Sequence, residues 1–225
     1  ALGDSGSTSI WFNDGSGNFT AGEPLAERVV SACFGDVDND GDEDLWLGRA
    51  GTDQVLLNDA AGSFTAAPHE AVGGPDTLTH LARLMDMDSD GDLDFLAARL
   101  AAGDIPATPD ARPAACSLYN TNGDDSFTDV AAELGLEMAG TAVAAVVFDD
   151  LDNDYDLDLI VFPAQGQPIA WSNHRLGDYR ILDVETSGLD VEGVISATTG
   201  DPDKDGDRDL LVFSRSGLLL MENLG

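Results

Sequence analysis

A nine-residue acidic motif occurs four times along the chain and limits its possible folds more than any other feature. In each copy, aspartate stands at positions one, three, five, seven and nine, and three of the four copies have glycine at position six. The copies begin at Asp36, Asp86, Asp150 and Asp201, so their starts lie 50, 64 and 51 residues apart. Self-similarity at a period of this size indicates one structural unit repeated along the chain.

A second motif alternates with the acidic one. It is an apolar run that ends in asparagine and is followed, after a turn, by an aromatic residue. Its copies run from Asn13 to Phe19, Asn58 to Phe64, Asn122 to Phe127 and Asn173 to Tyr179, and a last copy ends at Asn223. Asparagine, aspartate and glycine between short apolar runs are typical of turns between β-strands.

Each repeat therefore predicts four short strands. The first precedes the acidic loop, the second follows it, the third carries the asparagine motif and the fourth begins at the aromatic residue. The expected first strands are Val29–Phe34, Leu78–Met85, Ala142–Phe148 and Val194–Thr199, and the expected second strands are Leu45–Leu47, Phe95–Ala97, Leu159–Phe162 and Leu210–Phe213. Four strands in about 50 residues are typical of a propeller blade, so we predict an all-β propeller with its acidic loops on one side.

The repeats divide the chain as one propeller segment over residues 1–225. We expect units near 9–48, 54–98, 117–163 and 168–214, a further strand at 217–225 and an insertion at 101–113. Residues 130–136 could form one helical turn. The chain holds four strand sets plus one duplicated strand, which predicts additional blades, from missing sequence or a partner chain, in a ring of about seven. The alternative is a closed four-bladed ring in which the extra strand pairs at the seam.

The acidic loops predict metal sites. Alternating carboxylates gather several oxygens around one point, and a hard cation that takes six to eight oxygen ligands is calcium before magnesium. We expect up to four Ca²⁺ ions. The candidate ligands are Asp36, Asp38, Asp40, Asp42, Asp44, Asp86, Asp88, Asp90, Asp92, Asp94, Asp150, Asp152, Asp154, Asp156, Asp158, Asp201, Asp203, Asp205, Asp207 and Asp209.

An EF-hand loop begins in the same way but needs an acidic ligand at position twelve and flanking helices. Position twelve is instead Leu47, Ala97, Val161 or Val212, each within an apolar strand-like run. The sequence therefore argues against an EF-hand.

These loops, with Phe34-Gly35 leading into the first, resemble the FG-GAP/VCBS repeats, the family that includes the calcium-bearing blades of integrin α-subunit propellers. The stretch Leu118–Leu136 is similar to the bacterial and cartilage-acidic-protein-like branch of those repeats. The resemblance covers nearly the whole chain. It implies side-chain ligation by positions one, three, five and nine and ligation by the backbone carbonyl of position seven.

The four sites should bind calcium unequally. Loop one has a formal charge of −6 and loop two of −5, whereas Lys204 and Arg208 reduce loop four to −3. Loop three departs from the pattern because Tyr155 stands where glycine is expected, and a positive φ costs a non-glycine residue about 1–2 kcal/mol. We therefore rank loops one and two above loops three and four.

No catalytic constellation is visible in the sequence. His69, His80 and His174 lie in three different units, and neither a nucleophile elbow nor a phosphate-binding glycine loop occurs. We expect Trp11, Trp46 and Trp171 to lie in the blade core. The carboxylates outside the loops, which are Glu23, Glu27, Asp53, Glu133, Glu185 and Glu192, are expected mostly on solvated faces.

Two functions fit these observations. The first is an extracellular calcium-binding propeller that acts as a binding, adhesion or scaffold module for a protein or glycan ligand. The second is the propeller portion of a secreted polysaccharide lyase or hydrolase. Weak oxygen sites suit the millimolar calcium found outside the cell, so we expect an extracellular, cell-surface or periplasmic location.

The composition argues against other partners and against a disulfide framework. The 225 residues carry 43 acidic and 10 basic side chains, a formal net charge of −33, which repels nucleic acid and anionic lipid. The apolar run Ala142–Phe148 is far shorter than a membrane span. Cys33 and Cys116 could form a single bridge, or they could be two small buried apolar residues.

Overall fold

The computed structural model describes residues 8–25, 29–68, 72–101, 113–122, 126–136, 142–183 and 187–225. These residues form an all-β structure. The strands are β1 (Thr8–Asn13), β2 (Phe19–Leu25), β3 (Val29–Gly35), β4 (Asp44–Thr52), β5 (Gln54–Asn58), β6 (Phe64–Ala66), β7 (Gly73–Met85), β8 (Asp94–Ala101), β9 (Pro113–Thr121), β10 (Phe127–Asp129), β11 (Val143–Asp149), β12 (Asp158–Pro163), β13 (Ile169–Asn173), β14 (Tyr179–Ile181), β15 (Val194–Gly200), β16 (Asp209–Ser214) and β17 (Gly217–Met221).

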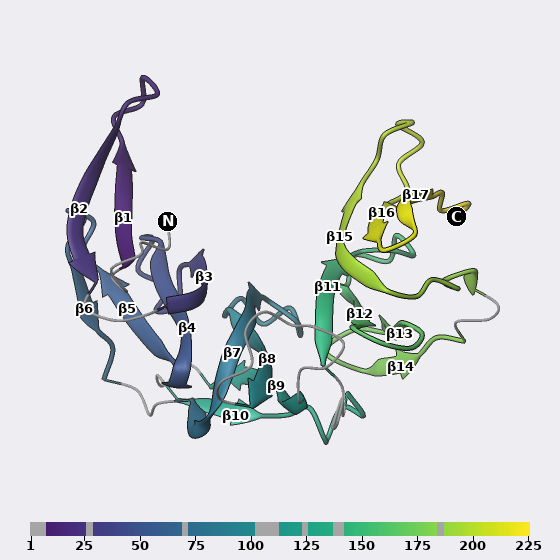
Figure 1. The fold of residues 1–225 in the computed structure, drawn as a ribbon, viewed down its shortest axis with the longest axis horizontal. Helices are drawn as coiled ribbons and strands as arrows, with labels where there is room; N and C mark the ends of the chain where they lie inside the picture. The colour runs from purple at the N-terminus through teal and green to yellow at the C-terminus, as the bar shows by residue number, and fades with distance from the viewer. Residues whose placement is uncertain are drawn as a thin grey trace.

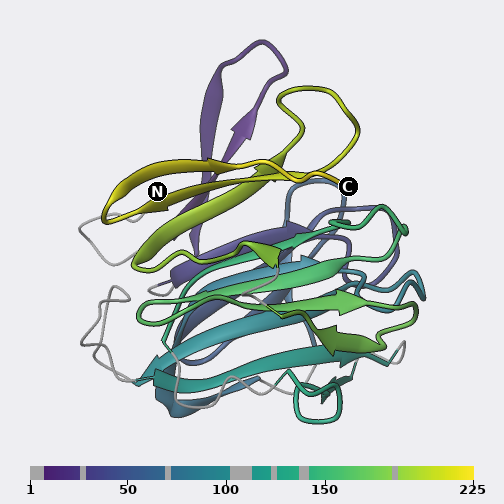
Figure 2. The same cartoon turned by 90° about the vertical axis from the view of Figure 1, so that its right-hand side faces the viewer.

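The strands form successive antiparallel units that follow one another along an arc (Figure 1). Unit one is β3–β6, unit two is β7–β10, unit three is β11–β14, and unit four is the three strands β15–β17. The hairpin β1–β2 forms a separate two-stranded sheet beside unit one. Viewed from the side, the strands of neighbouring units run across the molecule one above another (Figure 2).

The predicted strands are present, and the acidic loops connect the first and second strand of each unit. The second strands of units two and three are the most deeply buried, because they lie inside their sheets with a neighbouring unit on each face. Burial covers all of Asp158–Pro163 in β12 and Asp94–Leu100 in β8. This two-sided burial explains why these segments are continuous apolar runs rather than alternating ones.

Side chains from adjacent units form the core. Trp46 of unit one stacks on Phe95 of unit two, with ring centroids 3.3 Å apart, and Trp171 lies in the cluster between units two and three. Gly35, the residue that ends β3, permits this close stacking. A Cβ atom there would lie 2.6 Å from Leu93 Cδ1 and 2.8 Å from Leu84 Cδ1, so a larger residue would require these two side chains to shift.

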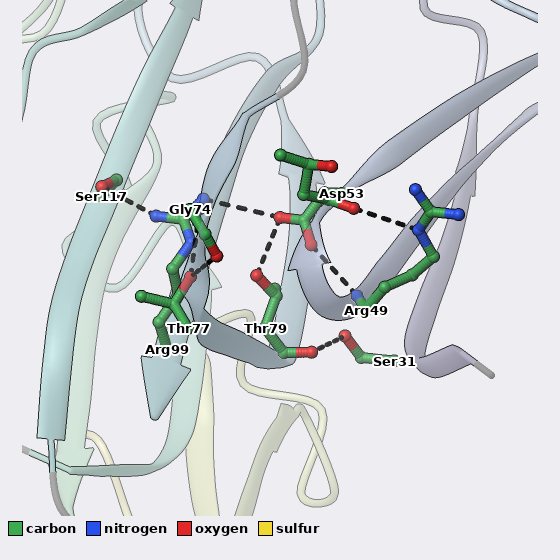
Figure 3. Close-up of polar contacts among 9 residues, drawn as sticks. Ser31, Arg49, Asp53, Gly74, Thr77, Thr79, Arg99 and Ser117 are labelled. Atoms are coloured by element: carbon green, nitrogen blue, oxygen red, sulfur yellow. Dashed lines mark hydrogen bonds and ion pairs between the residues drawn. The ribbon is translucent and has the colours of Figure 1, made fainter. Parts of the chain in front are cut away.

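Units one and two also share backbone hydrogen bonds. The long strand β4 pairs with β7 at Ala50↔Leu78 and Thr52↔Gly73, so the strands of these two units form one continuous sheet. A buried polar cluster lies at this junction (Figure 3). Asp53 accepts hydrogen bonds from the Arg49 backbone (3.1 Å) and the Thr79 hydroxyl (2.8 Å) and forms an ion pair with Arg99 at 3.5 Å.

Asp53 was expected with the carboxylates of solvated faces, and that expectation is wrong because the β4–β7 junction encloses it. Its exposed fraction is 3%. Glu23, Glu133 and Glu192 are exposed, as expected, and Glu27 and Glu185 lie outside the described residues.

Trp11 was expected in the blade core but is 54% exposed, on the hairpin β1–β2. Trp46 and Trp171 are buried, as expected. Trp11 and Trp171 each stand two residues before the asparagine of their motif, but β1 pairs only with β2 among the described strands, so no wider sheet encloses Trp11.

The closed four-bladed ring is not formed by the described residues. The hairpin β1–β2 packs against unit one through Ile10 and Leu25, while β17 pairs with β16 at the opposite end of the arc (Figure 1).

The insertion expected at 101–113 lies between two strands. Ala101 ends β8, Pro113 begins β9, and residues 102–112 lie outside the described part. The segment Val130–Leu136 forms one turn, with hydrogen bonds from Leu134 N to Val130 O and from Leu136 N to Ala131 O.

Cys33 and Cys116 are free thiols, and burial raises the pKa of Cys33 to about 11 and that of Cys116 to about 12. Neither cysteine is therefore a thiolate at neutral pH. Among the residues described, no helix has the length and apolar character needed to cross a bilayer.

Candidate calcium sites

Each acidic loop brings three carboxylates together at one end of its unit. In loops one, two and four these come from positions one, three and five, which are Asp36, Asp38 and Asp40; Asp86, Asp88 and Asp90; and Asp201, Asp203 and Asp205. In loop three they are Asp150, Asp152 and Asp158, so Asp154 stands outside the group. Within each group, one ligand oxygen per residue lies within 4.8 Å of the others.

This spacing fits calcium. Ca²⁺ binds oxygen at about 2.3–2.6 Å, so two ligand oxygens on opposite sides of one ion lie about 5 Å apart. The groups contain carboxylate oxygen without sulfur or imidazole, which suits a hard cation. Without a cation, the same spacing would leave several negative charges in mutual repulsion.

Backbone N–H groups hold the first carboxylate of the loop in place. In loop one, Asp36 accepts hydrogen bonds from the backbone of Asp40 (3.1 Å) and Gly41 (3.0 Å). Asp86 and Asp150 accept the same two bonds in loops two and three. This wrapping needs left-handed backbone at positions four and six, and φ at position six is 96° for Gly41 and 72° for Tyr155.

The aspartate at position nine is buried and joins the loop to the third strand of its unit. Asp44 Oδ2 accepts a hydrogen bond from Val37 N (2.8 Å), and its Oδ1 accepts one from Asn58 N (2.9 Å). The equivalent donors are Met87 and Thr121 for Asp94, Leu151 and Asn173 for Asp158, and Asn223 for Asp209. A position-nine carboxylate can therefore hold the hairpin together as well as supply a ligand.

These bonds correct the position of the third copy of the asparagine motif, which the sequence analysis placed at Asn122. Thr121, and not Asn122, is the structural equivalent of Asn58 and Asn173, because its N–H reaches the position-nine carboxylate and it pairs with Phe127. The Thr121 hydroxyl also donates to Leu93 O at 2.6 Å, much as the Asn58 amide donates to Glu43 O.

The aspartates at position seven, Asp42, Asp92, Asp156 and Asp207, each donate a backbone hydrogen bond to the position-five carboxylate of their own loop. Two of them also accept a bond from the preceding loop. Asn39 Nδ2 donates to Asp92 Oδ1, and Asn153 Nδ2 donates to Asp207 Oδ1, both at 2.5 Å. Loops one and two, and loops three and four, are therefore neighbours at the same edge of the arc.

Loop four differs from the others. Asp201 accepts a hydrogen bond from Lys204 N (2.6 Å) in place of the two bonds from positions five and six. Position two is Pro202, which has no N–H, so Asp209 lacks the donor that Val37, Met87 and Leu151 supply elsewhere. The missing hydrogen bonds agree with the low calcium affinity that the formal charge predicts for loop four.

Asp38→Ala should therefore remove more of the calcium-dependent rise in melting temperature than Asp203→Ala. Both variants delete the position-three carboxylate, but Asp38 belongs to the loop with the larger negative charge and the regular hydrogen bonds. Differential scanning fluorimetry with and without calcium measures this rise for each variant. Equal losses in the two variants would contradict the ranking.

Replacing Tyr155 by glycine should stabilise the protein by about 1 kcal/mol, because a non-glycine residue at φ 72° is strained. The Tyr155 side chain is 93% exposed, so little packing is lost. Tyr155→Ala is the matched control, since it removes the same ring but keeps the strain. Urea midpoints measure the difference, and a Gly variant no more stable than the Ala variant would show that φ is not the cause.

Burial raises the pKa of two position-nine carboxyls in the metal-free protein, to about 7 for Asp94 and to about 6 for Asp158. Their pKa in the unfolded chain is near 3.9. Between about pH 7 and pH 4 the folded state thus binds more protons than the unfolded state, so stability increases as the pH falls.

Calcium-free protein should accordingly have a higher urea midpoint at pH 5.5 than at pH 7.5. Saturating calcium should reduce the difference, because the ion favours the ionised carboxyls. A metal-free midpoint that falls on acidification over this range would contradict the pKa directions.

The histidines do not join an acidic group in the described part. His80 lies on β7 with its Nε2 2.8 Å from Val143 O, and burial lowers its pKa, so it is a packed neutral residue. His174 is exposed in the turn after β13, and His69 lies outside the described residues.

Comparison with known proteins agrees with this geometry. Residues 36–97, which span loops one and two, match the model of the FG-GAP-like repeat family. No curated protein matches the chain significantly. The chain superposes with a TM-score of 0.58 and 16% identity on the structure of a lectin from Agrocybe aegerita, described for its specific recognition of non-reducing terminal N-acetylglucosamine.

That alignment covers 96% of this chain and 57% of the lectin chain, so this chain spans just over half the length of its structural relative. A structure of BBS1N in complex with ARL6DN aligns over 88% of this chain and 63% of that one, at 12% identity. Its TM-score of 0.43 is too low to support a conclusion about fold. Residues 36–97 are an FG-GAP-like repeat, and the chain that contains them has a β-propeller-like fold.

Proposed function

We propose that this chain is an extracellular calcium-binding propeller module that recognises a protein or glycan ligand. The observation that carries the proposal is the recurrence of one carboxylate group, with ligand oxygens within 4.8 Å, in the same loop of four successive units. The FG-GAP-like repeat over residues 36–97 and the lectin-like fold support a binding module.

Calcium would act structurally at these sites. In loops one, two and four, positions one, three and five would supply side-chain oxygens, and in loop three positions one, three and nine would do so. Position seven would supply its backbone carbonyl, and position nine of the other loops a further carboxylate oxygen. The ion would neutralise the repulsion within each loop and hold the first and second strands of a unit together. Since sites of this type are filled at millimolar calcium, the proposal places the protein outside the cytosol.

We favour a binding role over a catalytic role for this chain. The candidate base His80 is engaged by a backbone carbonyl, and the perturbed carboxyls Asp94 and Asp158 are held by backbone N–H groups at the position-nine junction. If the protein includes an enzyme, we propose that catalysis belongs to another region and that this segment is its scaffold.

Exposed aromatic side chains on the hairpin β1–β2 supply one candidate surface for a glycan. Trp11 is 54% exposed, Phe12 40% and Phe19 59%. Aromatic faces bind the apolar faces of sugars, and the structural relative is a lectin. A protein ligand could use the same side chains, because aromatic residues are enriched at protein interfaces.

Calorimetric titration of the metal-free protein tests the calcium proposal. We expect up to four sites with dissociation constants of about 0.1–1 mM. Screening a glycan array and a panel of extracellular proteins, with calcium and with chelator, tests the ligand class. Absence of calcium binding at millimolar concentration would refute the metal proposal, and turnover of a polysaccharide by the isolated chain would refute the binding role.

A further inference from the structure

The aspartate at position three has different surroundings in loops one and two. Asp88 of loop two is partly buried, whereas Asp38 of loop one is exposed. The Asp88 Oδ2 atom accepts a hydrogen bond from Asn120 Nδ2 at 2.8 Å. Its Oδ1 atom is buried and has no hydrogen-bond partner in the described part of the chain. A buried carboxylate oxygen without a partner is unfavourable, and a cation in loop two would satisfy it.

Asn120 lies on β9, outside the acidic motif. It pairs with the residue that follows the aromatic of β10, and the same register places Leu57 of unit one and Ser172 of unit three at the equivalent position. Ser172 Oγ donates to Asp152 Oδ2 at 3.1 Å, so this position reaches the position-three carboxylate in both units. Leu57 has no side-chain donor and packs against the cluster around Trp46. The third strand therefore supplies a donor to loops two and three but not to loop one.

Unit three helps to enclose Asp88. A Cβ atom at Gly177, in the turn between β13 and β14, would lie 3.6 Å from Asp88 Cβ, which is an ordinary van der Waals contact. Unit three also holds the backbone beside Asp88, because Asn173 Nδ2 donates to Met87 O at 3.0 Å. Contacts of this kind reduce the water around Asp88, and a cation attracts a carboxylate more strongly where less water surrounds them.

The larger negative charge of loop one does not outweigh this difference. Loop one is more negative than loop two because Glu43 stands at its position eight, and Glu43 is exposed. Water and salt screen an exposed charge, so Glu43 adds little to the attraction of an ion in the loop. In contrast, removing a hydrogen bond that orients a ligand carboxylate typically lowers metal affinity by about 10- to 100-fold.

We propose that loop two binds calcium more tightly than loop one, and that Asn120 is the cause because it holds the Asp88 carboxylate in place for the ion. The inference rests on the calcium binding proposed above and adds a positioning residue from outside the acidic motif. The Asn120 amide restricts the Asp88 side chain to one orientation before the ion binds, so less conformational entropy is lost on binding. It also occupies Asp88 Oδ2, which leaves Oδ1 for the ion.

Calcium titration of the whole chain, followed by NMR, measures the loops separately. The reporters are the backbone amides of Gly41 and Gly91, which donate to Asp36 and Asp86 within their own loops. We expect the Gly91 amide to reach half of its shift at a calcium concentration about tenfold lower than the Gly41 amide. A Gly41 amide that responds first, or both amides responding together, would overturn the proposal. If neither amide responds at millimolar calcium, the proposed calcium binding itself fails, and this inference fails with it.

Two substitutions at one position test the role of Asn120. Asn120→Leu introduces the residue of unit one and removes the donor, and we expect it to weaken calcium binding at loop two by at least about tenfold. Asn120→Ser introduces the residue of unit three, whose hydroxyl can still donate, and should bind calcium more tightly than the Leu variant. Equal affinity of loop two in the Leu variant and in the wild type would overturn the role of Asn120.

Ser172→Ala is the matched control, because it removes the equivalent donor from loop three. It should weaken calcium binding at loop three, where the Tyr155 amide that donates to Asp150 is the reporter, and leave loop two within about twofold of the wild type. A purely structural role of Asn120 would instead weaken all loops together and lower the urea midpoint in chelator. Such a result in Asn120→Leu would overturn the proposal. If the Leu variant fails to fold, the order of Gly91 and Gly41 in the wild type still decides.

Discussion

Removing calcium is expected to lower the melting temperature of this protein by roughly 5–20 °C. If each site binds with a dissociation constant of about 0.1–1 mM, calcium at about 1 mM adds roughly 0.4–1.4 kcal/mol per site. Four sites would add roughly 2–6 kcal/mol, a large part of the stability of an ordinary domain. The physical cause is the carboxylate groups of the four loops, whose oxygens lie within 4.8 Å of one another.

Scanning calorimetry in calcium and in chelator, at matched ionic strength, measures the effect. Magnesium at the same concentration is the control for charge screening, since it binds flexible oxygen cages less well than calcium. Equal melting temperatures with calcium and with chelator would show that the loops are not structural metal sites.

Replacing Arg99 by methionine is expected to destabilise the folded protein by about 3–5 kcal/mol. The variant leaves the Asp53 carboxylate enclosed at the β4–β7 junction, where only the Arg49 N–H and the Thr79 hydroxyl would still donate to it in the contacts described. It also removes the bond from Arg99 to the Ser117 hydroxyl (2.9 Å) (Figure 3). An unpaired buried charge is far less favourable than the same charge in water.

Arg180→Met is the matched control. Arg180 pairs with Asp178 at 2.7 Å, which is shorter than the 3.5 Å of the Arg99–Asp53 pair, but both of its side chains are more than half exposed. Exposed pairs contribute about 1 kcal/mol or less. Urea unfolding measures the free energy of unfolding of both variants. A loss of stability in Arg180→Met as large as that in Arg99→Met would show that burial does not determine how much an ion pair stabilises this protein.

The strands and acidic loops could be predicted from the sequence because their causes are local. Apolar runs bounded by turn residues identify β3, β11 and β15, and alternating aspartates around Gly41 or Gly91 identify the loops. The expected positive φ at Tyr155 is likewise local, since the wrapped loop imposes it on whichever residue stands at position six. Such features need no knowledge of which units lie side by side.

The features that could not be predicted depend on contacts between distant segments. Asp53 is buried because its partner Arg99 arrives from β8, 46 residues later. Trp11 is exposed because β1 lies in a two-stranded sheet, while Trp46 is enclosed by unit two. Thr121 replaces an asparagine because the position-nine carboxylate binds a backbone N–H, which any residue other than proline supplies.

The backbone pairing of β4 with β7 also sets the order in which the fold comes apart. In an array of repeats, each unit is stabilised by itself and by its neighbours. Units one and two are joined by main-chain bonds and open together, whereas the sheet β15–β17 is held to unit three through side chains in the part described. Amide protons of the sheet β15–β17 and of the hairpin β1–β2, which also shares no main-chain pairing with its neighbour in the part described, will therefore exchange before those of β4, β7 and β8. The two ends of the arc thus open before the junction that encloses Asp53.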